Sequence, residues 1–297
     1  MRSKLFVILV TFFLLNSTDV FSQDDFTAIR SIEDSLIHTI DSMYDIKIPD
    51  DRPEYNARVI KQLVRALKIT NSYKYPFDSL SKRISVFYAD DKQFRIFNWS
   101  ISSDDVTQRY YAAIQMNSEE LKLYPLVDCA ADLGKSAEDA VLAKRKWYGA
   151  IYYNVVSKEI DGKTVYILFG KNASGALSNK KLMEPMMFTD SGVVFGAQIF
   201  NIRSQNKPTE RINRFIIEYK KQAQASLNWD KEQNLVYVDR LESDVNDPNR
   251  KYTYVPTGQY DGFRWIDGYW NYIQDLIPIE SLKDGQAPTP QPYKGRD

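Results

Sequence analysis

Few residues in this sequence could act as catalytic nucleophiles or bases. The chain has one histidine, His38, and one cysteine, Cys129. A Ser-His-Asp triad or a Cys-His dyad would have to use His38, since both need an imidazole to accept the proton of the nucleophile. His38 lies in a stretch with helical spacing, and nothing in the local sequence places it beside Cys129. We therefore expect Cys129 to be a small buried hydrophobic residue.

Metal and phosphate sites are not indicated either. The sequence has no H-E-x-x-H motif and no set of several Cys or His residues, which zinc sites require. The glycine-containing run 170–175 has the wrong spacing for a phosphate-binding loop. Residues 244–249 alternate oxygen-bearing side chains but lack the glycine and the final glutamate of a calcium loop. We expect no cofactor and no bound metal.

Carboxylates are the remaining candidates for acid-base chemistry, as in glycoside hydrolysis, where two of them flank the scissile bond. The available carboxylates are Asp90, Asp91, Asp104, Asp105, Glu119, Glu120, Glu184 and Asp239. Adjacent residues of a strand point to opposite faces, so no pair is a ready dyad, and most lie in expected turns. Glu184 differs because it lies inside the apolar run LMEPMMF, where an ionised group must be exposed, paired or functional. Pro185 beside it is typical of an edge strand, which favours exposure.

The stretch FRWIDGYWNYI, residues 263–273, carries five aromatic residues among eleven. Asp267-Gly268 should form a two-residue type I′ turn between two strands. The resulting register places four rings on one face, namely Phe263, Trp265, Trp270 and Tyr272. Buried, these rings would fix the hairpin to a core; exposed, they would form a platform for sugar rings or peptide side chains. Packing is the favoured interpretation, and the four rings are also the candidate ligand-binding site.

The elements that position these residues change character along the chain. Apolar residues recur at spacings of three and four over 26–43 and again over 59–67, which predicts a helical hairpin. From Ile84 the period changes to two, and about ten strand segments follow one another with short turns between them. Residues 135–146 are helix formers and predict one helix within this β-rich part. The pair Tyr152-Tyr153 should put one ring on each side of a sheet, so that one of them lies at the surface or in a cleft.

These patterns predict an α+β fold, with N-terminal helices packed on a large antiparallel β meander or open barrel. A β-propeller is the alternative, because hairpin follows hairpin. The expected divisions are a signal peptide at 1–23, a helical segment at 24–83, an antiparallel β-rich domain at 84–280, and a disordered Pro-rich tail at 281–297.

The N-terminus indicates export. Arg2 and Lys4 precede an apolar run at 5–15, and polar residues follow at 16–19. This is the layout of a signal peptide, and the apolar run is too short to anchor the chain across a bilayer. We expect a periplasmic or secreted protein with no integral membrane segment after cleavage. A single cysteine allows no internal disulfide, so stability must come from a hydrophobic core.

The charge balance argues against a nucleic-acid-binding protein. The chain has 39 basic and 39 acidic residues, for a formal net charge of zero. Proteins that bind nucleic acid usually carry a basic face, and no cluster of Lys and Arg of that kind is present.

Two stretches resemble a known group of sequences. FYADDKQFRIFNWSISSDD, followed by a Tyr-rich strand, and the C-terminal YDGFRWIDGYW are similar to uncharacterised exported β-rich proteins of Gram-negative bacteria. The resemblance implies export and a β-rich architecture. It implies no activity, because the shared motifs are those of hairpins.

Three functions fit these observations, in this order. The first is an exported, non-catalytic β-rich module that binds a glycan, a peptide or an envelope partner. The second is a carboxylate-dependent polysaccharide hydrolase, which needs two carboxylates in one cleft. The third is a structural component of an envelope assembly, with the N-terminal helices as the docking element. The missing catalytic constellations favour a protein that is not an enzyme.

Overall fold

The structure is a computed structural model that describes residues 23–102, 107–202 and 209–276 of the 297-residue chain. The expected signal peptide, apart from Gln23, and the expected Pro-rich tail lie outside these residues. Within the described part of the chain, no helix is both long enough and apolar enough to span a membrane.

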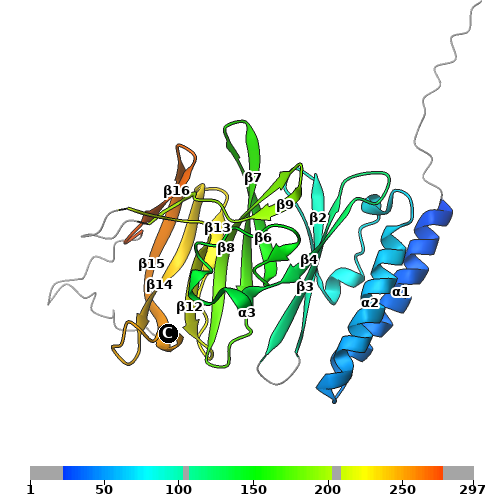
Figure 1. Ribbon diagram of the computed structural model, residues 1–297, viewed down its shortest axis with the longest axis horizontal. Helices are drawn as coiled ribbons and strands as arrows, with labels where there is room; N and C mark the ends of the chain where they lie inside the picture. Colours follow the sequence, from blue (N-terminus) through cyan, green and yellow to red (C-terminus); the bar gives the residue numbers. More distant parts are fainter. Residues whose placement is uncertain (1–22, 103–106, 203–208, 277–297) are drawn as a thin grey trace, which may run out of the picture.

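The described residues form four layers that follow one another in roughly the order of the sequence (Figure 1). A helical layer comes first, and three β-sheets are stacked behind it. We call them the first, second and third sheets. Nearly all neighbouring strands are antiparallel; the pairs β4–β5 and β10–β16 are parallel.

The helical layer is an antiparallel pair of helices with three short 3₁₀ turns. Its elements are α1 (Gln23–Asp45), η1 (Pro49–Asp51), α2 (Arg52–Leu67), η2 (Ser72–Lys74) and η3 (Leu80–Lys82). The buried side chains of α2 include Val59 and Leu63, one helical turn apart, so a single apolar stripe faces the first sheet.

The first sheet has the strand order β1-β2-β3-β4-β5. Its strands are β1 (Ser85–Tyr88), β2 (Phe94–Ser102), β3 (Gln108–Met116), β4 (Leu123–Asp128) and β5 (Lys146–Trp147). The second sheet has the order β12-β8-β7-β6, and β9 also pairs with β8. Its strands are β6 (Ile151–Ile160), β7 (Lys163–Asn172), β8 (Ser178–Thr189), β9 (Gly192–Phe195) and β12 (Phe215–Lys220).

The third sheet has the order β11-β10-β16-β15-β14-β13. Its strands are β10 (Phe200–Ile202), β11 (Glu210–Ile212), β13 (Leu227–Asp230), β14 (Leu235–Ser243), β15 (Tyr254–Ile266) and β16 (Tyr269–Ile273), and η5 (Lys251–Thr253) precedes β15.

Three hydrophobic cores lie between the four layers. On β2, Phe94 faces the second sheet, whereas Phe97 and Trp99 face the helices. On β7, Leu168 faces the first sheet and Ile167 faces the third. The period of two is therefore present in both strands, but both of their faces are buried.

This two-sided burial corrects the expected topology. The chain is rich in antiparallel strands and carries a few helices, as expected. The strands do not form one meander or an open barrel, and they are not arranged as propeller blades; they divide into three open sheets. A single sheet exposes one face to solvent, and the continuous burial along β2 and β7 requires a layer on each side.

The prediction of a helix at 135–146 is wrong. The chain forms a single helical turn, α3 (Ala130–Leu133), and a 3₁₀ turn, η4 (Gly134–Ser136), and is then irregular. Leu142 is buried and forms an isolated bridge with Phe195, so this segment pairs with the second sheet instead of with itself. Tertiary contacts override helix propensity here.

Candidate functional site

The structure separates the two residues of a possible Cys-His dyad. His38 is exposed on α1, on the outer side of the first sheet. Cys129 is buried in the core between the first and second sheets, where its thiol donates to the carbonyl of Trp147 at 3.2 Å. Burial raises the pKa of the Cys129 thiol. The prediction that Cys129 is a buried hydrophobic residue is confirmed.

Glu184 is not exposed on an edge strand, which corrects the expectation from Pro185. It is completely buried on β8, which lies between β7 and β12. One carboxylate oxygen lies 2.5 Å from Nη2 of Arg214, and the other accepts a hydrogen bond from the Tyr152 hydroxyl. β8 tolerates the proline because Pro185 falls between the part that pairs with β12, which ends at Met183, and the part that pairs with β9.

The other carboxylates do not assemble into a dyad of the kind that sequence reasoning considered. Asp91 accepts a hydrogen bond from the hydroxyl of Tyr166 at 2.6 Å, and Glu119 and Glu120 are exposed. Asp104 and Asp105 lie outside the described residues. Among the residues that the structure describes, no group of three or more His, Cys, Asp or Glu side chains could hold a metal ion.

The aromatic hairpin has the predicted register. Trp265 is opposite Trp270 and Phe263 is opposite Tyr272, with Asp267 at φ 52° in the turn. The four rings lie on one face, in the core between the second and third sheets. Phe263 and Trp270 are fully buried, and Trp265 and Tyr272 are half-buried. They contact one another edge to face rather than forming a flat exposed platform. Ligand binding by these four residues stays a prediction.

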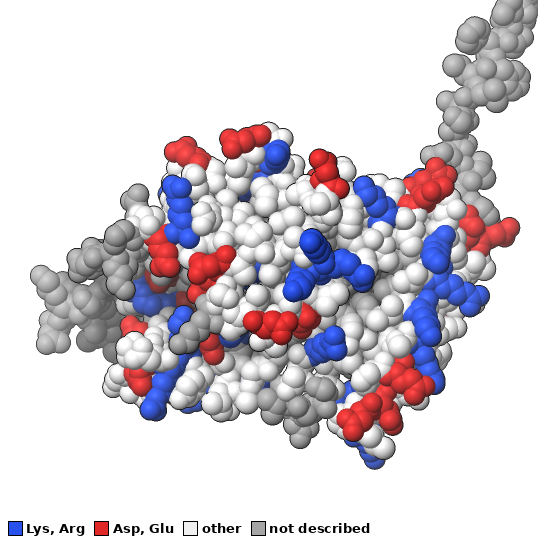
Figure 2. All heavy atoms as spheres, viewed as in Figure 1, with Lys and Arg blue, Asp and Glu red and all other residues white. Residues whose placement is uncertain are grey.

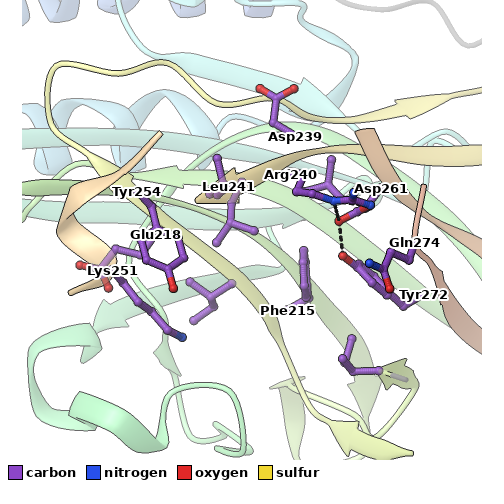
Figure 3. Close-up of a pocket in the computed structure, with 14 residues that line it drawn as sticks. Phe215, Glu218, Asp239, Arg240, Leu241, Lys251, Tyr254, Asp261, Tyr272 and Gln274 are labelled. Carbon is purple, nitrogen blue, oxygen red and sulfur yellow. Dashed lines mark hydrogen bonds and ion pairs between the residues drawn. The ribbon is translucent and has the colours of Figure 1, made fainter. Parts of the chain in front are cut away.

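A groove opens where the second and third sheets separate, between β12 and strands β14, β15 and β16 (Figure 3). We call it the β12 groove; its volume is about 450 Å³. The apolar residues that line it are Ile202, Phe215, Ile216, Ile217, Val238 and Leu241. Of the four aromatic residues predicted to share a face, Tyr272 lines this groove. Phe263 packs against the lining residue Phe215, with a ring centroid distance of 4.7 Å.

An ordered polar cluster forms one end of the β12 groove. A β-bulge in β14 between Asp239 and Leu241 presents Arg240, consistent with the role of bulges in redirecting side chains. The Arg240 guanidinium forms an ion pair with Asp261 and donates to Asp275 at 2.6 Å. The Tyr272 hydroxyl also donates to Asp261, as Figure 3 shows.

The surroundings of Arg240 and Tyr272 shift the pKa of each upward. Hydrogen bonds to Asp261 and Asp275 raise the pKa of Arg240, so the guanidinium stays charged. Burial, followed by the hydrogen bond to Asp261, raises the pKa of Tyr272 well above its ordinary value, so its hydroxyl stays a donor. Asp261 is nearly fully buried, and both its oxygens already accept hydrogen bonds. The cluster is therefore a fixed cross-link among β14, β15 and β16.

The opposite end of the β12 groove holds charges of both signs. Figure 3 shows Glu218, Lys251 and Tyr254 gathered there, while Asp239 points away from the groove. Glu218 accepts a hydrogen bond from the Ser178 hydroxyl at 2.5 Å, and Tyr254 donates to the carbonyl of Pro248 at 3.0 Å. A second hollow, of about 580 Å³, adjoins this end, since both hollows are lined by Ile216, Glu218 and Lys251.

The β12 groove reaches the backbone of β12. Four successive residues, 215–218, all line it. Successive side chains of a strand point to opposite faces, so a groove that touches all four must pass along the edge of the strand. β12 pairs with β8 on one side only. Across the groove, β14 pairs with β13 only as far as Val238 and has β15 as its one partner beyond that point.

The chain matches no protein-family model, no curated protein and no solved structure. The roles of its residues therefore rest on geometry. Sequence reasoning missed Arg240, Asp261 and Lys251, because each is an ordinary charged residue in a strand or turn. The pair Tyr152-Tyr153 gave a usable signal for a surface site. As expected, the two rings lie on different sides of the strand: Tyr152 is buried, whereas Tyr153 is 40% exposed and lines another pocket, away from the β12 groove.

Proposed function

We propose that this chain is an exported, non-catalytic binding protein that takes a short, extended peptide segment in the β12 groove. The segment belongs to a free peptide or to an envelope protein. The observation that carries the proposal is that the groove follows the edge of β12 that has no strand partner, above an apolar floor. One backbone group of this edge, the N–H of Ile216, is bonded to the Glu138 carboxylate, which a bound strand would have to displace or pass. Extended peptides bind such edges by adding a strand, with pockets beside the edge accepting alternate side chains.

The lining of the groove favours a peptide over a glycan. Its floor is mostly aliphatic, with Leu241 and Ile217 among its residues. Sugar rings stack on flat, exposed aromatic faces, and the two indole rings of the terminal hairpin lie in the core instead. The charges of Glu218 and Lys251 at one end suit the polar ends or side chains of a peptide.

The same geometry ranks the other two functions lower. Asp261 is the most enclosed carboxylate of the groove, and both its oxygens are already bonded to Arg240 and Tyr272, which leaves it poorly placed to contact a scissile bond. The N-terminal helices bury most of their apolar residues against the first sheet, with Tyr44 and Ile60 exposed, which leaves them less suited to be the docking element of an assembly.

Selection of a displayed random-peptide library on residues 24–297 tests the proposal. Enriched peptides would be titrated against the wild type and against Tyr254→Ser, which removes a groove wall. Tyr260→Ser is the matched control, because Tyr260 lies on the same strand, is 37% exposed and is outside the groove. We expect Tyr254→Ser to weaken binding by about tenfold, the value of one buried aromatic contact, and Tyr260→Ser to leave it unchanged.

Two results would overturn the proposal. One is the failure of any enriched peptide to bind, and the other is equal binding by both variants and the wild type. Co-sedimentation of the same three proteins with insoluble peptidoglycan and polysaccharides covers the glycan alternative. Loss of co-sedimentation in Tyr254→Ser alone would assign the groove to a glycan and reject the peptide.

A further inference from the structure

A further pocket lies between the second sheet and β13, the edge strand of the third sheet, at a different opening from the β12 groove. Its volume is about 420 Å³, and its walls include Tyr153, Lys171, Lys181, Tyr219, Ser226 and Asn228. We call it the lysine pocket. Unlike the β12 groove, it has no carboxylate in its lining.

Two lysines face each other across neighbouring strands of this pocket. Lys171 on β7 is the direct register partner of Lys181 on β8. Like charges in directly opposed positions destabilise a sheet. Among the described residues, no carboxylate lies within ion-pair distance of either ammonium group. Within the part of the chain that the structure describes, the sheet therefore carries a repulsive pair that forms no ion pair.

The surroundings of Lys181 hold its ammonium group in place. Its Nζ lies 5.3 Å from the ring centroid of Tyr153, which is a cation–π contact. A β-bulge in β6 between Tyr152 and Asn154 turns Tyr153 into the pocket, and its hydroxyl donates to the carbonyl of Leu227 at 2.6 Å. The Tyr153 ring is thus a fixed wall beside the charge.

A third lysine adds to the positive charge. The Nζ of Lys221 donates to the carbonyls of Ala173 and Gly175 at 2.7 and 2.8 Å, which leaves one N–H without an assigned acceptor. Burial lowers the pKa of both Lys181 and Lys221, and the nearby charge of Lys171 lowers each further. The Asp239 carboxylate attracts Lys181 and also accepts the backbone N–H of Ser226 at 2.8 Å. The positive charge at and beside the pocket therefore exceeds the negative charge that Asp239 supplies.

We propose that the lysine pocket binds an oxyanion, carboxylate or phosphate, carried by a small ligand. The two opposed ammonium groups would each donate to the anion, which turns a repulsive pair into two charge-assisted hydrogen bonds. The side chains of Ser226 and Asn228 add neutral hydrogen-bonding groups on the facing wall. This site is independent of the peptide proposed for the β12 groove.

Isothermal titration of the protein with inorganic phosphate and with glucuronate, in buffer of constant ionic strength, tests the proposal. Glucose and sodium chloride are the neutral and monatomic controls. The comparison of phosphate with glucuronate shows which oxyanion source the pocket prefers. Lys181→Met and Lys171→Met remove one charge each and keep an apolar stem of similar length.

Lys180→Met is the matched control variant, because Lys180 is the neighbour of Lys181 on β8 and points to the opposite face. We expect at least one oxyanion to bind and each pocket variant to weaken its affinity by about tenfold, the loss of one charge-assisted hydrogen bond. Lys180→Met should bind like the wild type. The groove variant Tyr254→Ser should also bind the oxyanion normally, so failure of one proposal would not be mistaken for failure of the other.

Circular dichroism and thermal unfolding of each variant confirm that it folds. Removing one of two opposed like charges should not lower the melting temperature, so misfolding is not expected to obscure the result. The proposal is overturned if neither oxyanion binds more tightly than chloride, or if both pocket variants retain the wild-type affinity.

Discussion

Among the described residues, Arg95 and Arg214 are fully buried, and their partners differ. Arg214 pairs with Glu184, whereas Arg95 forms no ion pair with a described carboxylate. The Arg95 guanidinium donates to the carbonyls of Ser72 and Tyr75 and to the side chain of Gln115, and its Cζ atom lies 4.8 Å from the ring centroid of Phe77. It therefore ties the segment after α2 to the first sheet.

Truncation of Glu184 should be strongly destabilising. Glu184→Ala leaves the Arg214 charge buried without a counter-ion, and breaking such a pair costs about 3–5 kcal/mol. Urea unfolding measures the change. Glu54→Ala is the control, since Glu54 forms an exposed ion pair with Arg58 one helical turn away, worth at most about 0.5 kcal/mol. Equal stability losses in the two variants would show that the buried pair has no special role.

The pH dependence of oxyanion binding should reveal Lys181. Burial and Lys171 lower the pKa of Lys181, so its ammonium loses its proton at a pH below the ordinary lysine value of about 10.4. The affinity of the pocket for the oxyanion should therefore begin to fall at pH values below the ordinary lysine pKa. The unliganded protein should gain stability there relative to Lys181→Met, because its folded state binds fewer protons than the unfolded chain. Affinity that stays constant up to the ordinary lysine pKa would contradict this assignment.

At the scale of single elements, the connection between the first and second sheets depends on one glycine. The Asp128 carboxylate at the end of β4 accepts the backbone N–H groups of Tyr110, Ala130 and Gly149. A Cβ atom on Gly149 would lie 2.2 Å from the carboxyl carbon of Asp128. Only a residue without a side chain allows the chain to approach this carboxylate.

Gly149→Ala should therefore lower the free energy of unfolding by about 1–3 kcal/mol, as expected for overpacking in a closely packed region. A double-mutant cycle with Asp128→Ala checks the cause, since the alanine at position 149 should cost less when the carboxylate is absent. If the cost is the same in both backgrounds, the contact with Asp128 is not its origin.

At the scale of the whole molecule, each layer covers a face of its neighbour. The helices cover Phe97, Trp99 and Ile101 of the first sheet. Acidic and basic side chains are interspersed over the face of the molecule in Figure 2, without a large region of one sign. Adhesion between layers therefore depends on the buried apolar faces more than on long-range charge.

Removal of the helical layer should make the remaining sheets unstable. A chain that starts at residue 84 exposes the outer face of the first sheet, which is a large contiguous apolar patch. We expect this truncated protein to bind a hydrophobic dye and to unfold at a lower temperature than the chain from residue 24. An unchanged melting temperature without dye binding would show instead that the β-rich part is an independent domain.

The local structure of this protein could be read from its sequence, and the arrangement of its layers could not. The turn at Asp267-Gly268 and the pairing of Trp265 with Trp270 follow from turn chemistry and the alternation of a strand, which act over a few residues. The helix expected at 135–146 does not form, because the backbone of Leu142 bridges to Phe195, which lies far along the chain.

The candidate sites were decided by the tertiary structure alone. The β12 groove joins residues from β12, β14, β15 and β16, and the lysine pocket joins residues of β6, β7, β8 and β12 to β13 at the edge of the third sheet. The sequence determined which side chains share a strand face, because that depends on backbone geometry. It did not determine which faces meet, because burial free energy is non-directional and depends on how distant segments stack.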